Sequence, residues 1–466
     1  MEIVFLKDLV DKIIDNRGKN PKYSFSGIEV IETGCISGSK KYPDYSLVKK
    51  YVDNNTYKNW FRNGHPCKGD LLIITVGNNV GSISLMNENR GCITQNLIGL
   101  RLKENVCSDF IYYYLSQKEV FNYFQGLNIG SAQPSIKVPH LLNFELNIPD
   151  FLIQQKIAGI LSDLDGKIFL NYQTNKTLEF IAQAFFKSWF IDFDPVRAKI
   201  AAKKEGKDPE LAAMCVISGK SEVELQQMAK DDFAELQETA SLFPDELVET
   251  ELGEVPKGWE ITNINAVTAS IFSGGTPSTK EMTYWNGEIP WLSSGETRNK
   301  IIVSTEKSIT EIAVKKSSTK LAIFGDILIA SAGQGHTRGQ TSFNAIECYI
   351  NQSIVALRAN DKVSSYWLYY CLEPRYDEMR SLSDSHSSRG SLTTKLLASM
   401  PVILPTQKLV VNFDKVIKSM LAQQIKNLKE IKILTDTRDA LLPKLISGDI
   451  DVSTLASETE YEYSTE

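Results

Sequence analysis

The chain has 466 residues, of which 42% are hydrophobic and 23% are charged, and this predicts a globular protein of two or three domains. No apolar run approaches the roughly 20 residues of a membrane helix, no signal peptide is present, and the seven cysteines form no Cys-x-x-Cys pair, which predicts a cytoplasmic protein without a membrane partner. The formal net charge is −6, but two base-free segments (231–254 and 455–466) hold thirteen acidic residues and leave 44 acids against 51 bases, a balance that permits DNA binding.

The first predicted domain, here called the first head, spans residues 1–152. It contains the stretch NRGKNPKYSFSGIEVI at residues 16–31. Further on, KGDLLIITVGNNVGSISL (68–85) has the pattern of a Gly-Asp corner, an apolar strand and a Gly-rich turn. ITQNLIGLR, DFIYYYLSQ and LLNFELNIP follow and predict a strand, an aromatic-rich helix and a final strand. We expect a mixed α/β domain.

A long helix is predicted next, at residues 153–192. Its apolar residues recur at alternating spacings of three and four, which is the period of a coiled-coil seam. At 1.5 Å per residue, a helix of about 35 residues is roughly 50 Å long. The ladder consists of Ile157, Leu161, Leu164, Ile168, Leu178, Ala182, Phe185 and Trp189, with Asn171 and Asn175 in its middle.

Residues 193–258 are interpreted as a polar and acidic connector with some helix, and residues 259–406 as a second head. The second head repeats the first: FGDILIASAGQGHTRGQT (324–341), INQSIVALR, YWLYYCLEP and LLASMPVILP recur in the same order. Gly69 and Gly325 are 256 residues apart, and Arg101 and Arg358 are 257 apart. This ordered recurrence indicates an internal duplication of a large unit.

A second long helix is predicted at residues 407–448, followed by an acidic tail at 449–466. Asn171 and Asn427 occupy matching positions of the two helices, which predicts a polar rung that sets their register. Each helix could pack on its own head, but two similar helices more plausibly pack on each other. We therefore expect an α+β protein: two mixed α/β heads separated by two long helices packed as an antiparallel coiled coil, with a pseudo-two-fold internal repeat. The second ladder consists of Phe413, Ile417, Met420, Gln424, Asn427, Ile431, Leu434, Leu441 and Leu445.

Catalytic motifs are absent from the sequence. The four histidines lie at no metal-ligand spacing from one another or from a cysteine pair, so we expect no metal site. The stretch SGGTPSTKEMTYWNGEIPWLSSGE (273–296) lacks the Gly-Lys-Ser/Thr ending of a phosphate loop. Asp70 and Asp326 could be nuclease carboxylates, but a Gly-Asp turn explains them equally well. We expect a chain without catalytic residues and without a cofactor of its own.

The chain closely resembles the specificity subunit of Type I restriction-modification enzymes. The stretch at 273–296 looks like the entry of a target-recognition domain of that family, and the stretch at 16–31 looks like the entry of a different class of such domain. FFKSWFIDFDPVRAK (185–199) and LGEVPKGWE (252–260) are similar to the family's central region, and RDALLPKLISGDIDV (438–452) to its C-terminal end. The acidic insert around residues 218–243 departs from this pattern.

The resemblance implies a division of labour. Each head would read one half of a split, double-stranded DNA target, and the paired helices would hold the heads apart and dock two methyltransferase (modification) subunits. S-adenosylmethionine would bind to those subunits, while ATP and Mg would belong to additional restriction and translocase subunits. The chain itself would be a non-catalytic component of a methyltransferase or endonuclease complex.

The resemblance also directs attention to polar loops and to the helix ladders. Hydroxyl and ammonium groups suit DNA phosphates, while amide and guanidinium groups suit base edges in the major groove. Tyr284, Trp285 and Trp291 are interpreted as supports of their loop or as stacking groups, and support of the loop is favoured. The DNA-binding candidates are Arg17, Lys19, Lys22, Asn78, Asn79 and Gln133 in the first head, and Thr276, Ser278, Thr279, Lys280, Gln334, His336, Arg338, Gln340 and Arg389 in the second. The candidates for docking a partner are Leu164, Ile168, Asn171, Leu178, Phe185, Trp189, Asn427, Leu434, Leu441 and Leu445.

Two other classes of protein remain open on the residues alone. A coiled-coil scaffold with protein-binding heads would have the same strand and helix patterns, and the net acidity favours it. A self-sufficient DNA methyltransferase or nuclease is disfavoured by the missing motifs. The repeated turn chemistry and the family-like ends favour the specificity subunit.

Overall fold

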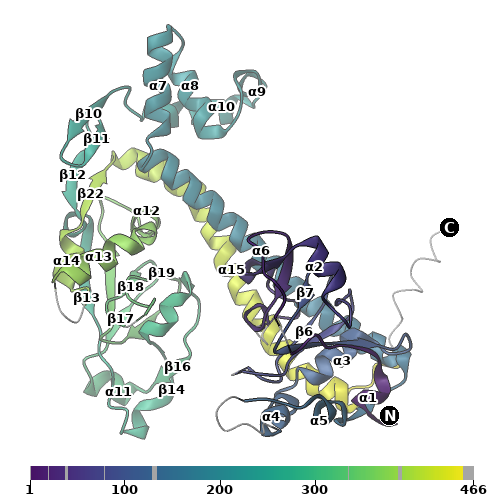
Figure 1. Ribbon diagram of the computed structural model, residues 1–466. Coiled ribbons are helices and arrows are strands. Elements are labelled where there is room, and N and C mark those ends of the chain that lie inside the picture. Colours follow the sequence, from purple (N-terminus) through teal and green to yellow (C-terminus); the bar gives the residue numbers. More distant parts are fainter. Residues whose placement is uncertain are drawn as a thin grey trace. The chain divides into compact units, whose positions relative to one another are not determined.

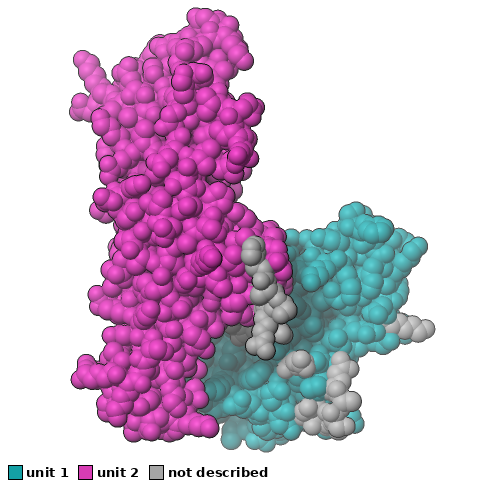
Figure 2. Space-filling model, turned by 90° about the vertical axis from the view of Figure 1, so that its left-hand side faces the viewer, with its two compact units in different colours: residues 1–170, 430–466 teal, residues 171–429 magenta. Residues whose placement is uncertain are grey.

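The computed structural model describes residues 2–18, 20–36, 40–77, 79–127, 134–333, 335–386 and 391–454. The chain divides into two compact units, one formed by residues 1–170 with 430–466 and the other by residues 171–429 (Figure 2). Each unit contains one head and one section of each long helix. The candidates Lys19, Asn78, Gln133, Gln334 and Arg389, and residues 455–466 of the predicted tail, lie outside the described residues.

The first head is built on a four-stranded antiparallel sheet in the order β2-β8-β5-β6. A second sheet has the order β4-β3-β7, in which β3 and β7 are parallel, and β1 pairs with β9. The strands are β1 (Glu2–Phe5), β2 (Val10–Ile14), β3 (Ile28–Ile31), β4 (Tyr51–Val52), β5 (Leu71–Ile74), β6 (Ile83–Leu85), β7 (Cys92–Ile93), β8 (Leu97–Leu102) and β9 (Glu145–Ile148). The helices are α1 (Leu6–Leu9), α2 (Asn54–Asn59), α3 (Ser108–Leu115), α4 (Lys118–Gly126) and α5 (Val138–Leu142), with 3-10 turns η1 (Thr33–Cys35) and η2 (Tyr45–Leu47).

The second head repeats this topology with additions. Its larger sheet has the order β13-β21-β18-β19-β15, its smaller sheet the order β16-β14-β20-β17, and β12 pairs with β22. The strands are β12 (Glu260–Asn263), β13 (Thr268–Ser273), β14 (Trp285–Leu292), β15 (Ile301–Ile302), β16 (Lys307–Ile309), β17 (Lys320–Ala322), β18 (Ile327–Ala330), β19 (Thr341–Asn344), β20 (Cys348–Ile350), β21 (Ile354–Ala359) and β22 (Pro401–Leu404). The helices are α11 (Glu311–Lys316), α12 (Ser365–Leu372), α13 (Tyr376–His386) and α14 (Thr394–Ser399), with 3-10 turns η3 (Ile264–Val267), η4 (Met282–Tyr284), η5 (Ser294–Arg298) and η6 (Glu373–Arg375).

The strand after each Gly-Asp corner is the centre of its head. All four residues of β5 and of β18 are buried, so each strand is covered on both faces. In β5, Leu71 and Ile73 belong to the core that includes α3, whereas Leu72 and Ile74 belong to the core on the opposite side. This alternation follows from the two-residue period of a strand. It explains why both strands read as continuous apolar runs.

The two long helices are α6 (Phe151–Phe190) and α15 (Gln407–Ser447), and they pair antiparallel (Figure 1). In the first unit, Arg438 of α15 forms an ion pair with Asp165 of α6 at 2.7 Å. In the second unit, the Asn427 side chain of α15 donates a hydrogen bond to the Asn175 side chain of α6 at 2.8 Å. The predicted fold class is therefore confirmed, and the polar rung is present.

The rung has a different partner from the one that the repeat suggests. Asn171 and Asn427 are both buried, at 5% and 3% exposure, but Asn427 bonds to Asn175. Gln424 strengthens the same rung, because its side-chain amide donates to the Asn175 backbone carbonyl at 3.2 Å and its backbone carbonyl accepts from the Asn175 side chain at 3.2 Å. In an antiparallel pair a residue faces its repeat equivalent only at the pseudo-two-fold axis, so matching positions alone do not identify the contact.

The segment predicted as a polar connector contains a folded helical cluster. It consists of α7 (Asp194–Glu205), α8 (Pro209–Ser218), α9 (Glu222–Gln226) and α10 (Lys230–Ser241), followed by the hairpin β10 (Leu247–Thr250) and β11 (Gly253–Pro256). Lys199 is buried inside it, where the ammonium donates to Glu210 at 2.7 Å and to the Phe243 carbonyl at 2.8 Å. Phe243 packs edge-on against Trp189 of α6, with ring centroids 5.4 Å apart. Despite its polar composition, this segment therefore folds around a buried core.

Within the described residues, none of the helices is both long and apolar enough to cross a membrane. The same residues contain no group of three or more His, Cys, Asp or Glu side chains that could hold a metal ion.

Candidate nucleic-acid interface

Each head is held together beneath its loops by one buried carboxylate and one arginine. In the first head, Asp70 is 2% exposed and accepts two hydrogen bonds from Arg101, at 3.0 and 2.8 Å. In the second head, Asp326 is 1% exposed and accepts two from Arg358, both at 2.8 Å. These carboxylate bonds raise the pKa of both guanidinium groups. The pair joins the Gly-Asp corner to the neighbouring strand β8 or β21.

This geometry favours the structural interpretation of the two aspartates. The second oxygen of Asp70 also accepts the Cys67 amide at 2.8 Å, and that of Asp326 accepts the Ile323 amide at 2.9 Å. Both carboxylates are thus occupied by hydrogen bonds from their own head. A nuclease carboxylate would instead face a metal ion or a water molecule.

The stretch at 273–296 forms the loop between β13 and β14 and the strand β14 itself. Gly274 lies so close to β20 that a Cβ atom would come within 1.9 Å of the Ile350 carbonyl oxygen. A Cβ atom on Gly275 would come within 2.1 Å of the Ser318 hydroxyl. The Gly-Gly pair is therefore required for close backbone packing and does not form a phosphate loop.

Two tryptophans support this loop, as the sequence predicts. The Trp285 indole donates to the Ser278 carbonyl at 3.1 Å, and the buried Trp291 indole donates to the Gly275 carbonyl at 3.4 Å. Their rings meet at 90° with centroids 5.1 Å apart. Because the backbone is fixed from beneath, the polar side chains of the loop are presented outward. Thr276, Ser278, Thr279 and Lys280 are all exposed.

In the turn between β18 and β19, one of the predicted base-reading residues is exposed to solvent and two are held by contacts within the second head. His336 is exposed, and its carbonyl accepts from the Tyr376 hydroxyl at 3.0 Å. Arg338 is only 8% exposed and forms an ion pair with Asp384 at 2.5 Å. Gln340 is half-buried and accepts from the Thr297 hydroxyl at 3.4 Å.

These contacts give Arg338 a role in positioning the turn on α13. Its guanidinium lies against the domain in this structure, although the sequence suggests a base contact. Arg380 of α13 contributes to the same anchor through a hydrogen bond to the Gly335 carbonyl at 2.5 Å. The sequence gives no local signal for Arg380, because the turn and α13 are brought together only by the fold.

In the first head, the candidate loop lies between β2 and β3. Arg17 forms a forked ion pair with Asp15, with distances of 2.8 and 2.6 Å, and this hydrogen bonding lowers the pKa of Asp15. Lys22 of the same loop is exposed, and so is Asn79, which lies in the turn between β5 and β6. The structure therefore presents Lys22 and Asn79 to solvent and holds Arg17 against its neighbour.

The helix ladders place most of the predicted docking residues inside the structure. Leu164, Ile168, Leu178 and Leu434 are half-buried, and Leu445 is buried in the core of the first unit, against which Leu441 also packs. The large apolar side chains of these helices that are exposed include Phe169, Leu170 and Ile433 in the first unit and Tyr172 and Phe180 in the second. A strict seam pattern does not identify these, because they fall between its rungs.

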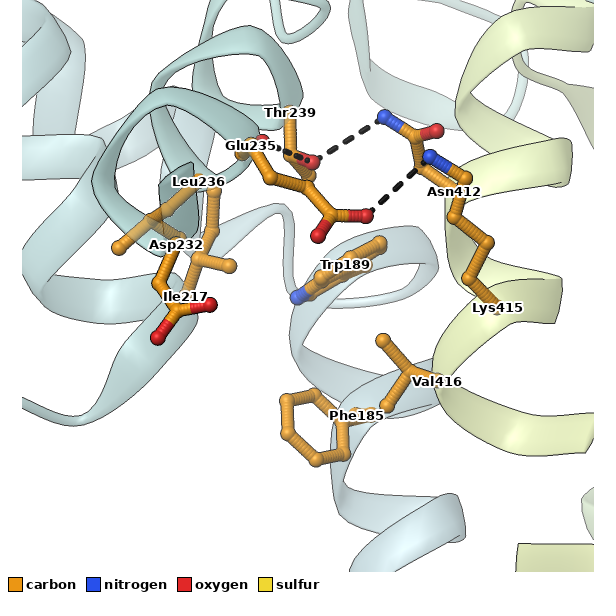
Figure 3. A pocket seen from close by; sticks show the side chains of 10 residues that line it. All are labelled: Phe185, Trp189, Ile217, Asp232, Glu235, Leu236, Thr239, Asn412, Lys415 and Val416. Atoms are coloured by element: carbon orange, nitrogen blue, oxygen red, sulfur yellow. Dashed lines mark hydrogen bonds and ion pairs between the residues drawn. The ribbon is translucent and has the colours of Figure 1, made fainter. Parts of the chain in front are cut away.

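Phe185 and Trp189 line a pocket of about 360 Å³ where α10 meets the long helices (Figure 3). Its floor is apolar and aromatic, and its rim carries Asp232 and Glu235 of the acidic insert. Glu235 forms an ion pair with Lys415 of α15 at 3.2 Å. The insert is thus fixed on the helices at the residues that the sequence assigns to partner docking.

Comparison with known proteins adds to this geometry. Residues 1–179 and 256–435 match the family model of the Type I restriction modification DNA specificity domain. The Type I restriction enzyme HindI specificity subunit of Haemophilus influenzae is 34% identical over 361 residues, which cover 74% of this chain and 78% of the relative. The MjaIX specificity subunit of Methanocaldococcus jannaschii is 24% identical over 359 residues, which cover 76% of this chain and 71% of the relative. The crystal structure of a Type I restriction-modification system S subunit from M. genitalium shares the fold, with a TM-score of 0.54, 16% identity and 95% coverage of both chains.

Proposed function

Because this chain belongs to the Type I restriction-modification DNA specificity family, we propose that each of its two heads reads one half of a split double-stranded DNA target. The observation that supports this proposal is that the two heads share the same strands and the same buried ion pair but differ in their loops. The buried Asp70–Arg101 and Asp326–Arg358 pairs occupy equivalent places, as do the strands around them. The loops that these frameworks support differ in length and sequence. Two heads of one fold with different surfaces suit two unlike half-sites.

The exposed groups of the loops suit a duplex. In the second head, the hydroxyls of Ser278 and Thr279 and the ammonium of Lys280 would bind phosphates, and His336 would reach a base edge. The Thr276 hydroxyl, which donates to the Gln352 side chain in this structure, would exchange that hydrogen bond for one to a phosphate. Arg338 would act by holding the turn that carries His336. In the first head, Lys22 would bind a phosphate and the Asn79 amide would reach a base.

The long helices would dock two methyltransferase subunits. Phe180 is 73% exposed and Tyr172 is 54% exposed on the α6 section of the second unit. Phe169 and Ile433 are 56% and 65% exposed in the first unit. Large apolar side chains left in water at such positions favour a protein partner. S-adenosylmethionine would bind to these partners, and ATP and Mg to restriction and translocase subunits, so this chain would direct the reaction without catalysing it.

Co-expression with a methyltransferase subunit of the same system tests the proposal. Methylated adenines would be mapped across a host genome by long-read sequencing. We expect a single motif with two specified halves and an unspecified spacer. As a second arm, exchanging residues 276–281 for an unrelated segment of the same length, with Gly274 and Gly275 kept for their close packing, should alter only the half read by the second head.

Contradictory outcomes are distinct. A stable complex that methylates no defined motif would overturn the proposal that the chain recognises a DNA sequence. A single motif without an unspecified spacer would overturn the proposal that each head reads one half of the target. A chain that captures no methyltransferase subunit, yet binds other proteins through its heads, would favour a scaffold.

A further inference from the structure

The loops that enter the two heads are topologically equivalent. In the first head the loop runs from β2 to β3, and Val30 of β3 pairs in parallel with Cys92 of β7. In the second head it runs from β13 to β14, and Trp291 of β14 pairs in parallel with Tyr349 of β20. β2 and β13 themselves each pair antiparallel with the long strand, β8 or β21, that carries the framework arginine.

Each of these loops ends in a large apolar side chain that the head leaves in water. Phe25 is fully exposed and lies three residues before β3. Met282 is 72% exposed and lies three residues before β14. A lysine precedes each of them closely, Lys22 in the first head and Lys280 in the second, and both lysines are exposed.

The backbone beneath these side chains is anchored. The amide of Ser24 donates to the Tyr51 carbonyl at 2.8 Å, and the Ser24 hydroxyl donates to the Ser26 carbonyl at 2.8 Å. In the second head the Tyr284 amide donates to the Glu281 carbonyl at 3.1 Å. The backbone around Phe25 and Met282 is thus held by hydrogen bonds, and the two apolar side chains are exposed and not packed in the core of their head.

Single exposed apolar residues are common and carry no meaning by themselves. Here the same feature recurs at the same topological position in two heads whose loop sequences differ. Each instance stands beside a cation that suits a phosphate. Proteins that bind the minor groove and bend DNA frequently insert Phe, Leu, Ile or Met between base steps, while basic and amide side chains contact the same groove.

We propose that Phe25 and Met282 are apolar wedges, each inserted between base pairs of its own half-site while Lys22 or Lys280 binds the flanking phosphate. This inference rests on the proposed function, because it requires that the heads bind DNA. It adds a contact that polar base-reading residues do not supply. The preferred position in each half-site is a pyrimidine–purine step, which unstacks most easily.

The test uses the complex of the full chain with its methyltransferase subunits and a duplex that carries the mapped motif. Phe25→Ala and Met282→Ala are compared with Ile3→Ala and Ile261→Ala. These controls are matched, because Ile3 of β1 and Ile261 of β12 occupy equivalent strands of the two heads and are 72% and 44% exposed. Binding is measured by fluorescence anisotropy, and base unstacking by 2-aminopurine placed at successive positions of each half-site.

We expect Phe25→Ala to raise Kd about tenfold, the scale of losing one base–aromatic stacking contact, and Met282→Ala, which removes no aromatic ring, to raise it less. Each variant should abolish the 2-aminopurine signal in one half only. Phe25→Leu should retain most of the affinity. Scrambling the DNA half that belongs to the altered head should remove the difference between variant and wild type, whereas scrambling the other half should preserve it.

Two results would overturn the inference while leaving the proposed function intact. One is wedge variants that bind and unstack DNA as the Ile3 and Ile261 controls do. The other is a loss of methyltransferase subunits from the complex without a change in DNA affinity per complex, which would mean that the tips contact protein. If the wild-type complex binds no two-part motif at all, the proposed function itself fails.

Discussion

Removing Arg358 should destabilise the second head more than removing Asp326, although the two side chains form a single ion pair. The reason is their unequal access to water. The Asp326 side chain is 1% exposed, whereas the Arg358 side chain is 36% exposed. In Arg358→Ala the carboxylate stays buried without its charge partner, but in Asp326→Ala the guanidinium can turn to solvent.

The magnitudes follow from the hydrogen bonds. An orphaned buried charge costs about 3–5 kcal/mol, so we expect a loss of that size for Arg358→Ala. Asp326→Ala leaves the Ile323 amide, which donates to the carboxylate at 2.9 Å, without an acceptor, and this costs about 1–3 kcal/mol. The double variant should resemble Asp326→Ala, because removing the carboxylate removes the buried charge.

Native-state hydrogen exchange with mass spectrometry measures these losses separately in each head. The peptides of β18 and β21 report on the second head, and those of β5 and β8 serve as the internal reference. A loss of about 3 kcal/mol in the free energy of opening corresponds to roughly a hundredfold faster exchange than in the wild type. Arg101→Ala and Asp70→Ala should give the same order in the first head, where the exposures are 32% and 2%.

Equal acceleration by Arg358→Ala and Asp326→Ala would refute the reasoning. A double variant that exchanges faster than Arg358→Ala would refute it as well, because the orphaned carboxylate would then not be the source of the loss.

Three further predictions concern other parts of the chain. Phe180→Ser should weaken the binding of a methyltransferase subunit roughly 10- to 100-fold in Kd with an unchanged melting temperature, since burying such a side chain contributes about 1.5–3 kcal/mol. Titration calorimetry measures the change in Kd, and Val223→Ser on α9, where the side chain is 64% exposed against 73% for Phe180, should leave it unchanged. Burial raises the pKa of Asp414 to about 6. The protonated carboxyl therefore contributes stability that is fully present below pH 4 and is lost as the pH rises through 6. Asp414→Asn should have a higher free energy of unfolding than wild type at pH 8 but not at pH 4, as measured by denaturant titrations at both pH values. Lys199→Met should lower the free energy of unfolding of the helical insert by about 1–3 kcal/mol, because the Phe243 carbonyl loses its hydrogen-bond donor. Hydrogen exchange should accelerate in α8 and α10 alone. Unchanged exchange in these helices would show that the buried ammonium does not stabilise the insert.

The sequence predicts best the features that depend on local periodicity. The ladder of threes and fours places both long helices, and the Gly-Asp corner followed by an apolar run places β5 and β18 at the centre of each head. These patterns depend on which face of an element is apolar, and the chain encodes that residue by residue.

Features that depend on partners from elsewhere in the chain are not predicted. Lys199 reads as a solvated residue of a polar connector, yet it is buried because Glu210 and the Phe243 carbonyl meet its ammonium. Arg338 reads as a free base-reading residue, yet Asp384 lies 2.5 Å from it. The partner of Asn427 is Asn175 because the docking of two antiparallel helices selects it. In each case the deciding residue lies at a distance in the sequence that no periodicity specifies.

The buried pairs also explain how two heads of one fold can carry unlike surfaces. Asp70 and Asp326 each accept two hydrogen bonds from the arginine of the neighbouring strand and one from a backbone amide of their own corner, and those bonds involve no residue of the exposed entry loops. A substitution in an exposed loop therefore leaves the framework's free energy nearly unchanged, since surface changes away from buried networks are usually within about 0.5 kcal/mol. Loops can then change residue by residue without unfolding the head that presents them. If each head reads one half of a DNA target, as proposed, the loops of one head can change while the framework of that head and the whole of the other head stay as they are.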